Sequence, residues 1–284
     1  MRLVIKLAGA LLDDAAAVER IAAQIAALSR DGHELLIVHG GGKIFTATLA
    51  RLGIQSEFVN GLRVTDRDTR DAAVMVFAGL LNKRLASAIS SGGIHAVGIS
   101  AADSNCFRAE AMVHNEQPGK LGYVGYITGV NVAFLESLWR ERIVPVACCL
   151  GLGADGELYN INADHMAAAA AEFIGAERLI YLTDVAGLLD GDKVIRAVSG
   201  VEIEALIRSS KVSGGMILKL EACKRALAGG VREVRIIGGS QPDALRKAAN
   251  GVRFPGTRVT PMFAVPQKRL EPAAGPAAKK AVAQ

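Results

Sequence analysis

The sequence predicts an α/β protein, a three-layer αβα sandwich around a central, mostly parallel sheet, arranged in two lobes. Four aliphatic residues in a row at 35–38 are typical of a strand buried on both faces, and further apolar strand-like segments recur along the chain. Amphipathic segments with helical spacing lie between them, and strands that alternate with helices are typical of a parallel sheet. The 284 residues are enough to bury a full core.

The formal net charge of +5 comes mostly from the C-terminal end of the chain. Residues 267–284 hold four basic residues and one acidic residue, so the rest of the chain is near +2. Because this end is also rich in Pro and Ala, we expect residues 267–284 to form a disordered tail. The sequence has no basic stripe with interleaved aromatic residues, so we do not expect nucleic-acid binding.

The chain shows no membrane or secretion signal. No run of about 18 or more apolar residues is without a charge, so we expect no membrane span. The N-terminus enters a strand directly and carries no signal-peptide pattern, so we expect a cytoplasmic protein. The four cysteines lack CxxC spacing and indicate neither a zinc site nor a disulfide scaffold; they are Cys106, Cys148, Cys149 and Cys223.

The first elements surround a glycine-rich turn. We expect a strand at 3–7, an alanine-rich helix at 13–28, and a second strand at 35–38. Three glycines follow at 40–42, and then a helix runs to about residue 52. This order would point unpaired backbone N–H groups at an anion, which glycine permits because it has no Cβ. An ordinary glycine-rich turn is the other interpretation.

A hairpin and a long helix come next. Residues 57–64 alternate around Asn60-Gly61, a dipeptide typical of a hairpin turn. We expect Thr65 or Asp66 to cap a helix that runs to about residue 89. Its apolar stripe is wide enough to serve as a subunit interface as well as core.

The remaining elements are expected in the following order: a strand at 96–99, short antiparallel strands within 104–131, a helix at 133–141, a strand at 143–149, a helix from about 162 to 174, a strand at 179–182, helices at 201–208 and 214–228, a strand at 233–237, and a last helix from 241.

Two motifs have alternative interpretations that we disfavour. Residues 151–156 match GxGxxG, but a dinucleotide fingerprint requires the helix to open within that loop. Here strand-like residues intervene, so a glycine-rich hairpin is preferred. Residues 39–42 and 98–102 could form the oxyanion loop and nucleophile elbow of a serine hydrolase. In a hydrolase of this type an acid and then a histidine follow the serine. Here the last histidine is His165, and more than a hundred residues follow it. Residues 103–106 also do not start the helix that a nucleophile elbow requires.

Two lysines lie at loop-facing positions that are unusual for a core. Lys6 ends the first strand, and Lys219 follows the glycines at 214–215 in the first turns of a helix. Either one alone could be a solvated surface lysine. Two cations beside separate glycine-rich anion loops suit a polyphosphate better. Asp164 could be only a first-turn acid, and Arg63 could be a plain hairpin charge or a carboxylate clamp.

Six ordered motifs resemble the N-acetylglutamate kinase branch of the amino acid kinase family. They are residues 6–9, 39–42, 59–66, 159–164, 182–188 and 214–219 within roughly residues 1–260, and there is no Walker A sequence. The resemblance implies the carbamate kinase-like fold. It implies a lobe at 1–176 that binds the acylated amino acid and dimerises through the helix at 66–90, and a lobe at 177–266 that binds ATP and Mg²⁺.

The resemblance also implies an activity, the ATP-dependent phosphorylation of the γ-carboxylate of N-acetyl-L-glutamate, the second step of arginine biosynthesis. A different acylglutamate such as N-succinylglutamate is one alternative. A catalytically weak, ligand-binding relative is the other; Ala8, where the family usually has glycine, favours it. Arginine-inhibited members carry an extra N-terminal helix that this chain does not show, so we expect a homodimer insensitive to arginine.

Site residues are carried over by motif. The resemblance implies that Lys6 and Lys219 stabilise the transferring phosphoryl group and that Asp164 orients both lysines. It assigns the acylglutamate to Gly41, Gly42, Arg63 and Asn160. It assigns the nucleotide to Gly9, Thr183, Asp184, Val185, Ala186, Gly187, Leu188, Lys211, Val212 and Ser213. No protein ligands are implied for a metal, since Mg²⁺ would be held through the ATP phosphates.

The chemistry agrees with this assignment independently. A γ-carboxylate has a reference pKa of about 4.3, so it is ionised at pH 7 and needs no general base. The reaction instead needs positive charge around the oxygens in transfer, which lysines and backbone amides supply. Closure of the lobes would exclude water from the reacting phosphate.

Overall fold

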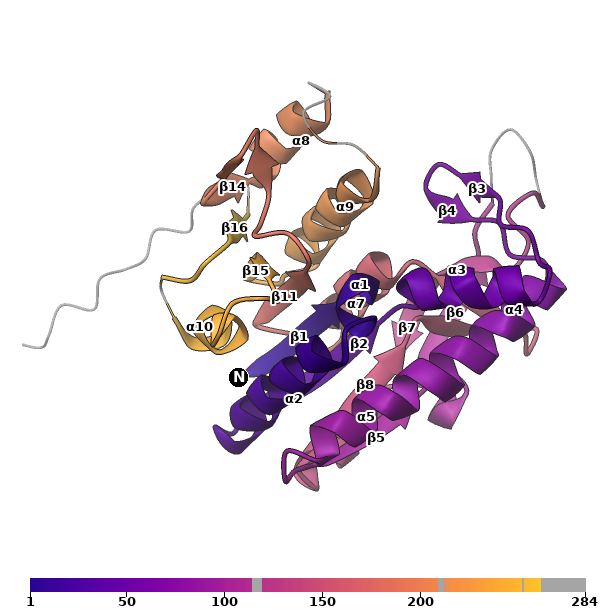
Figure 1. Cartoon of the computed structure of the whole chain (residues 1–284), viewed down its shortest axis with the longest axis horizontal. Coiled ribbons are helices and arrows are strands. Elements are labelled where there is room, and N and C mark those ends of the chain that lie inside the picture. The colour runs from indigo at the N-terminus through magenta and orange to yellow at the C-terminus, as the bar shows by residue number, and fades with distance from the viewer. Residues whose placement is uncertain (114–118, 209–211, 213, 252, 262–284) are drawn as a thin grey trace, which may run out of the picture.

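The computed structural model describes residues 1–113, 119–208, 212, 214–251 and 253–261. Its centre is an eight-stranded sheet in the order β14-β16-β15-β11-β1-β2-β8-β5 (Figure 1). Only the β15–β16 pair is antiparallel among the described strand pairs of this sheet, so the predicted mostly parallel sheet is confirmed. The strands are β1 (Arg2–Leu7), β2 (Glu34–His39), β5 (His95–Ile99), β8 (Ile143–Cys148), β11 (Arg178–Thr183), β14 (Ala197–Ser199), β15 (Glu233–Gly238) and β16 (Thr257–Thr260).

Helices cover both faces of this sheet, which confirms the three-layer sandwich. One apolar cluster joins the sheet to helices α2, α5 and α10, and the other joins it to α6, α7 and α9. The helices are α1 (Gly9–Leu12), α2 (Ala15–Arg30), α3 (Gly42–Arg51), α4 (Arg67–Val74), a π-helical turn (Met75–Leu81), α5 (Asn82–Ser90), α6 (Val132–Arg140), α7 (Ala163–Phe173), α8 (Gly200–Arg208), α9 (Gly215–Ala228) and α10 (Ala244–Asn250).

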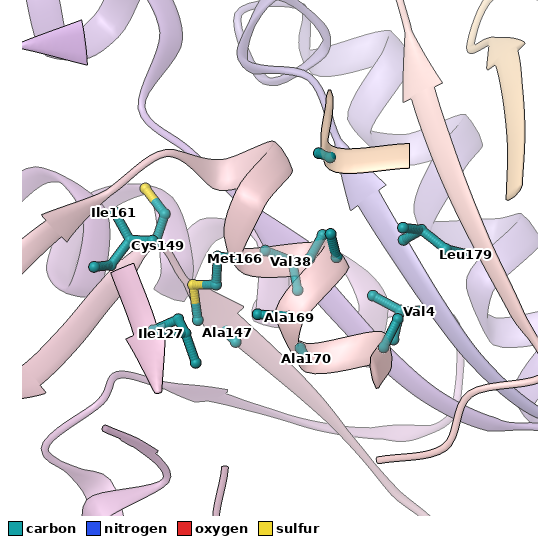
Figure 2. Close-up of a cluster of buried hydrophobic side chains, with 14 of the residues drawn as sticks. Val4, Val38, Ile127, Ala147, Cys149, Ile161, Met166, Ala169, Ala170 and Leu179 are labelled. Atoms are coloured by element: carbon teal, nitrogen blue, oxygen red, sulfur yellow. The ribbon is translucent and has the colours of Figure 1, made fainter. Parts of the chain in front are cut away.

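Helix α7 lies close to the sheet because its buried face is made of small side chains. Residues 167–171 are all alanine and are completely buried. Figure 2 shows Ala169 and Ala170 beside Val4 of β1, Val38 of β2 and Leu179 of β11. Alanine also has the highest helix propensity, so the same residues favour the helix and its close packing.

The smaller strands agree with most of the expectations. A hairpin joins β3 (Phe58–Val59) to β4 (Leu62–Arg63) around Asn60-Gly61, both with positive φ. The GxGxxG segment forms the predicted hairpin, with β9 (Leu150–Gly153) antiparallel to β10 (Leu158–Ile161). These two strands close into a small barrel with β6 (Phe107–Ala111) and β7 (Val124–Val130), a closure that was not predicted.

The long predicted helix is present and begins where its cap was expected. The side chain of Asp66 accepts a hydrogen bond from the backbone N–H of Thr69 at 2.8 Å. Among the described residues, the stretch Arg67–Ser90 is long and apolar enough to cross a membrane, and half of its most apolar window is buried in the molecule. A core helix has the same properties.

Some expectations were incomplete. Helix α1, strand β16, and the short strands β12 (Leu189–Asp190), β13 (Lys193–Val194) and β14 were not predicted, and α10 begins at Ala244 rather than at 241. The expected tail at 267–284 lies outside the described residues. The strands after residue 177 occupy one half of the sheet and the earlier strands the other half, and the role of each half as a lobe stays a prediction.

The carboxylate of Glu233 pairs with arginines of three neighbouring strands, β11, β15 and β16. Glu233 of β15 accepts a hydrogen bond from Arg235 Nε at 2.6 Å, and Arg258 Nε of β16 lies 2.9 Å from the same carboxylate. A guanidinium nitrogen of Arg178 on β11 lies 3.6 Å from the same carboxylate. Arg235 also donates to the backbone oxygens of Ala248 and Gly251, so this group attaches α10 to the sheet.

We predict that Glu233→Gln lowers the free energy of unfolding by about 3–5 kcal/mol, because it leaves buried guanidinium groups without their shared anion. Urea denaturation measures the change. The matched control is Glu204→Gln, which breaks an exposed pair with Lys224 and should cost at most about 1 kcal/mol. Equal losses in the two variants would contradict this role for Glu233.

Candidate active site

Three charged side chains meet in the interior where β1, α7 and α9 converge. Lys6 Nζ lies 2.6 Å from Asp164 Oδ1, and Lys219 Nζ lies 3.0 and 2.9 Å from Asp164 Oδ1 and Oδ2. Lys6 is 7% exposed, Asp164 8% and Lys219 6%. Two ammonium groups thus surround one carboxylate, and the group carries a net charge of +1.

The start of α7 fixes the carboxylate. Asn162 caps this helix by accepting hydrogen bonds from the backbone N–H groups of Asp164 and His165 at 3.0 and 3.1 Å. The hydroxyl of Tyr181 donates to the backbone oxygen of Asp164 at 3.0 Å. The centre of the Tyr181 ring also lies 4.9 Å from Lys219 Nζ. One side chain of β11 therefore contacts both Asp164 and Lys219. Sequence analysis did not single out Tyr181.

The charges determine how these groups titrate. Burial alone raises the pKa of Asp164, but Lys6 and Lys219 offset it and lower the pKa to about 2. Burial lowers the pKa of Lys219, and the charge of Lys6 lowers it further, while Asp164 acts in the opposite direction. Because a net positive charge is buried here, an anion that approaches the two lysines would be stabilised.

Two glycine turns face each other next to these charges. A methyl group at Gly9 would lie 2.3 Å from the Cα atom of Gly42, which itself has a φ of +51°. At Gly41 a methyl group would lie 2.0 Å from the Phe77 ring. Helices α1 and α3 begin at these turns without a side-chain cap at Ala8 or Gly41. Their first backbone N–H groups therefore suit an anion between the two turns.

The glycine turn after β2 also contacts α7. A methyl group at Gly40 would lie 3.2 Å from the Cβ atom of Ala163, the residue before Asp164. This is tighter than an ordinary van der Waals contact, so a side chain at Gly40 would press against the start of α7. The turn and the buried charges therefore share one location.

Ala8 does not disturb the glycine contact. Its backbone N–H donates to the oxygen of Leu182 at 2.9 Å, and its side chain packs against the apolar cluster on the α2 side of the sheet. The close approach to Gly42 is made by Gly9.

Arg63 is held between two aromatic rings. Its guanidinium carbon lies 5.0 Å from the centre of the Phe45 ring and 4.5 Å from that of Phe58. The group donates to Thr46 Oγ1 at 2.8 Å and to the Ser56 hydroxyl, and burial lowers its pKa. A plain solvated hairpin charge does not describe this position.

Asn160 is joined to the same hairpin through Thr65. Its side-chain nitrogen donates to Thr65 Oγ1 at 3.1 Å, and this hydroxyl donates to the backbone oxygen of Arg63 at 2.9 Å. No described hydrogen bond or ion pair joins Arg63 or Asn160 to Lys6, Asp164 or Lys219. The tip of the hairpin does reach α9: a methyl group at Gly61 would lie 3.1 Å from Leu218 Cδ1, beside Lys219.

Residues 183–188 begin at the last residue of β11 and lie at the same edge of the sheet as Gly9. The parallel register pairs Leu7 with Leu182, so the turns after β1 and β11 lie side by side. The Thr183 hydroxyl donates to Asp184 Oδ1 at 3.0 Å, and the Leu188 N–H donates to Thr257 Oγ1 at 2.8 Å. Val185 and Ala186 lie against Gly238, and Gly187 lies against Thr257. Val212 is buried, whereas Lys211 and Ser213 lie outside the described residues.

His39 and Asn82 form a buried link that sequence analysis did not identify. His39 is fully buried, with Nδ1 3.1 Å from the oxygen of Gly40 and Nε2 3.1 Å from Asn82 Nδ2. A carbonyl only accepts, so this network assigns the proton to Nδ1. Burial lowers the pKa of His39 to about 4, and the ring is neutral at pH 7. Asn82 also donates to the oxygen of Val146, so the glycine turn is attached to α5 and β8.

Comparisons with known proteins identify the family of this chain. Residues 1–238 match the amino acid kinase family. The chain is 47% identical over 246 residues to the acetylglutamate kinase of Koribacter versatilis, covering 86% of this chain and 93% of that one. It is 45% identical over 260 residues to the acetylglutamate kinase of Solibacter usitatus, covering 91% and 99%.

A solved structure gives the same answer for the fold. The N-acetylglutamate synthase from Neisseria gonorrhoeae, complexed with coenzyme A and N-acetyl-glutamate, superimposes with a TM-score of 0.81 at 25% identity. The match covers 91% of this chain and 59% of that one. The predicted resemblance is confirmed, and the chain belongs to the amino acid kinase family.

Proposed function

We propose that this protein is an acetylglutamate kinase, which transfers the γ-phosphoryl group of ATP to the γ-carboxylate of N-acetyl-L-glutamate in arginine biosynthesis. The products are N-acetyl-L-glutamyl 5-phosphate and ADP. The observation that carries the proposal is the convergence of Lys6 and Lys219 on Asp164 beside two facing glycine turns. The relatives named acetylglutamate kinase support the choice of substrate.

The reaction needs no proton transfer. A carboxylate oxygen of the acceptor forms a bond to the γ-phosphorus, the bond from that phosphorus to the bridging oxygen breaks, and its electron pair leaves with ADP. Negative charge on the γ-phosphoryl oxygens is stabilised by Lys6 and Lys219. Asp164 contacts neither substrate in this proposal. It positions both ammonium groups, which would otherwise repel each other.

The remaining site residues have binding roles. The acylglutamate is held by Gly41, Gly42, Arg63 and Asn160, with Arg63 as the clamp for a carboxylate. The nucleotide is held by Gly9, residues 183–188 and residues 211–213. Mg²⁺ enters with ATP and is held through its phosphates, because Asp164 is already engaged by two lysines. Among the described residues no group of three or more His, Cys, Asp or Glu side chains could hold a metal ion.

A homodimer formed through the helical stretch at 66–90 completes the proposal, and we place the protein in the cytoplasm. Met75 is 60% exposed and Leu80 is 40% exposed, so this stretch presents two large apolar side chains to solvent. Their burial against a second copy would remove this apolar surface from water.

The direct test is a coupled ADP-release assay with N-acetyl-, N-succinyl- and free glutamate as acceptors. We expect turnover with N-acetylglutamate and the highest kcat/KM for it. A higher kcat/KM for N-succinylglutamate would identify that compound as the acceptor instead. A complete lack of turnover with all three would leave only a ligand-binding protein.

The two proposed roles predict opposite kinetic effects. Lys219→Ala should lower kcat by roughly 10²–10³-fold with little change in acceptor KM, because it removes charge needed in the transition state. Arg63→Ala should raise acceptor KM at least about tenfold and change kcat much less. Steady-state kinetics measure both effects, and Lys224→Ala, an exposed lysine on the same helix, is the control. Exchanged effects would mean that the roles are wrongly assigned.

Asp164→Asn should change the pH dependence of the reaction. Burial and the charge of Lys6 lower the pKa of Lys219, and the carboxylate of Asp164 raises it. Removing the carboxylate therefore lowers the pKa of Lys219. Activity requires the charged ammonium group, and the alkaline limb of the kcat/KM profile should therefore move to lower pH. The profile is measured alongside thermal unfolding, which reports structural damage. An alkaline limb at the wild-type position would contradict the positioning role.

A further inference from the structure

A second basic site lies at the last strands of the sheet. A cavity of about 410 Å³ is open there between the start of β14 and the turn that leads into β16. Three of its six lining residues are arginines, and none of the six is acidic. They are Arg196, Ala197, Arg253, Phe254, Gly256 and Arg258.

This cavity lies on the opposite side of the sheet from the proposed nucleotide turn. Along β16, Val259 packs in the apolar cluster that contains α9, and Thr257 accepts from Leu188 on that same side. Side chains alternate along a strand, so Arg258 between them faces the other side, where α10 and Phe254 lie. None of residues 183–188 lines the cavity.

Positive charge exceeds negative charge beneath the cavity. Among the described ion pairs, Glu233 is the carboxylate shared by Arg178, Arg235 and Arg258. Two further arginines, Arg196 and Arg253, are exposed at the rim. Burial lowers the pKa of Arg178, and the neighbouring charge of Arg235 lowers it further. A multivalent anion in the cavity would offset this excess.

Packing holds part of the cavity wall in place, at Phe254, Gly256 and Arg258. The Phe254 ring lies 4.3 Å from the guanidinium carbon of Arg235 and 5.8 Å from that of Arg258, so the ring and both cations are packed together. Gly256 has a φ of +135°, and a methyl group there would lie 2.3 Å from the oxygen of Ile236. The turn therefore lies directly on β15, and a guanidinium group held in place suits an oxyanion better than a mobile one does.

We propose that this cavity binds a small oxyanion with two or more negative charges, carried by phosphate or carboxylate groups. Planar guanidinium groups bind both kinds of oxyanion in bidentate geometry, which fits a site formed by arginines without lysine. The site is separate from the Lys6–Asp164–Lys219 group, and its existence does not depend on the proposed activity.

Isothermal titration of the full chain with pyrophosphate and with citrate, at constant ionic strength, tests the proposal. We expect saturable binding of at least one of the two anions. The double variant Arg196→Ala/Arg253→Ala should weaken it by about tenfold or more, since it removes two charged donors. Both side chains are exposed, so the fold should be kept. The control Arg51→Ala/Arg67→Ala removes two exposed arginines elsewhere and should leave binding within about twofold.

The same titrations on Lys219→Ala separate this cavity from the active site. Binding there should stay within about twofold of wild type, because Lys219 lies outside the cavity. Binding of pyrophosphate alone would identify a phosphate ligand, and binding of citrate alone a carboxylate ligand. The proposal is overturned if neither anion binds, if Lys219→Ala and not the arginine pair removes binding, or if both arginine pairs weaken it equally.

Discussion

The structure depends most on one buried carboxylate held between two ammonium groups. Asp164, Lys6 and Lys219 come from three elements that are far apart in sequence, and each is less than a tenth exposed. Removing one partner of such a buried group typically costs about 3–5 kcal/mol, because it leaves an uncompensated charge. The packing of α7 and α9 on β1 is therefore tied to the same side chains that carry the proposed chemistry.

The group of Lys6, Asp164 and Lys219 has a net positive charge, so it favours the binding of an anion beside it. Two cations and one anion leave a net positive charge, which an apolar replacement of similar size would not have. The glycine turns supply the second half of the requirement. Gly9 and Gly42 touch through their backbones, so the starts of α1 and α3 lie side by side. Ammonium groups and backbone N–H groups together form a surface suited to a phosphoryl group in transfer.

The sequence was informative where one local pattern determines the local structure. The hairpin at Asn60-Gly61, the cap at Asp66 and the glycine turn after β2 each depend on a few adjacent residues, and each was predicted. Lys6, Asp164 and Lys219 were recognised as three separate signals. Their convergence results from tertiary packing, which cannot be detected in any short segment of sequence. The resemblance to the family therefore named the three residues, and only the structure shows that they are in contact.

The missed features have physical reasons of the same kind. Strand β16 has four residues and follows Pro255-Gly256, so its pattern is too short to detect. Asn82 did leave a signal, because it is a polar residue between buried Leu81 and Leu85 on the apolar stripe of its helix. A fully buried amide nitrogen needs partners, and these are His39 Nε2 and the backbone oxygen of Val146. The nucleotide roles of Gly9 and of residues 183–188 and 211–213 stay predictions, and Lys211 and Ser213 lie outside the described residues.

The hairpin β3–β4 connects the proposed acceptor clamp Arg63 to helix α9. Arg63 is fixed by Phe45 and Phe58, and its backbone is attached to Asn160 through Thr65. The same hairpin touches Leu218 at Gly61, one residue before Lys219. A side chain at Gly61 would crowd Leu218, and the positive φ there also disfavours one. Arg63, the proposed acceptor clamp, and Lys219, the proposed phosphoryl-stabilising lysine, are thus attached to the two sides of one contact, so a shift of the hairpin would change the positions of both.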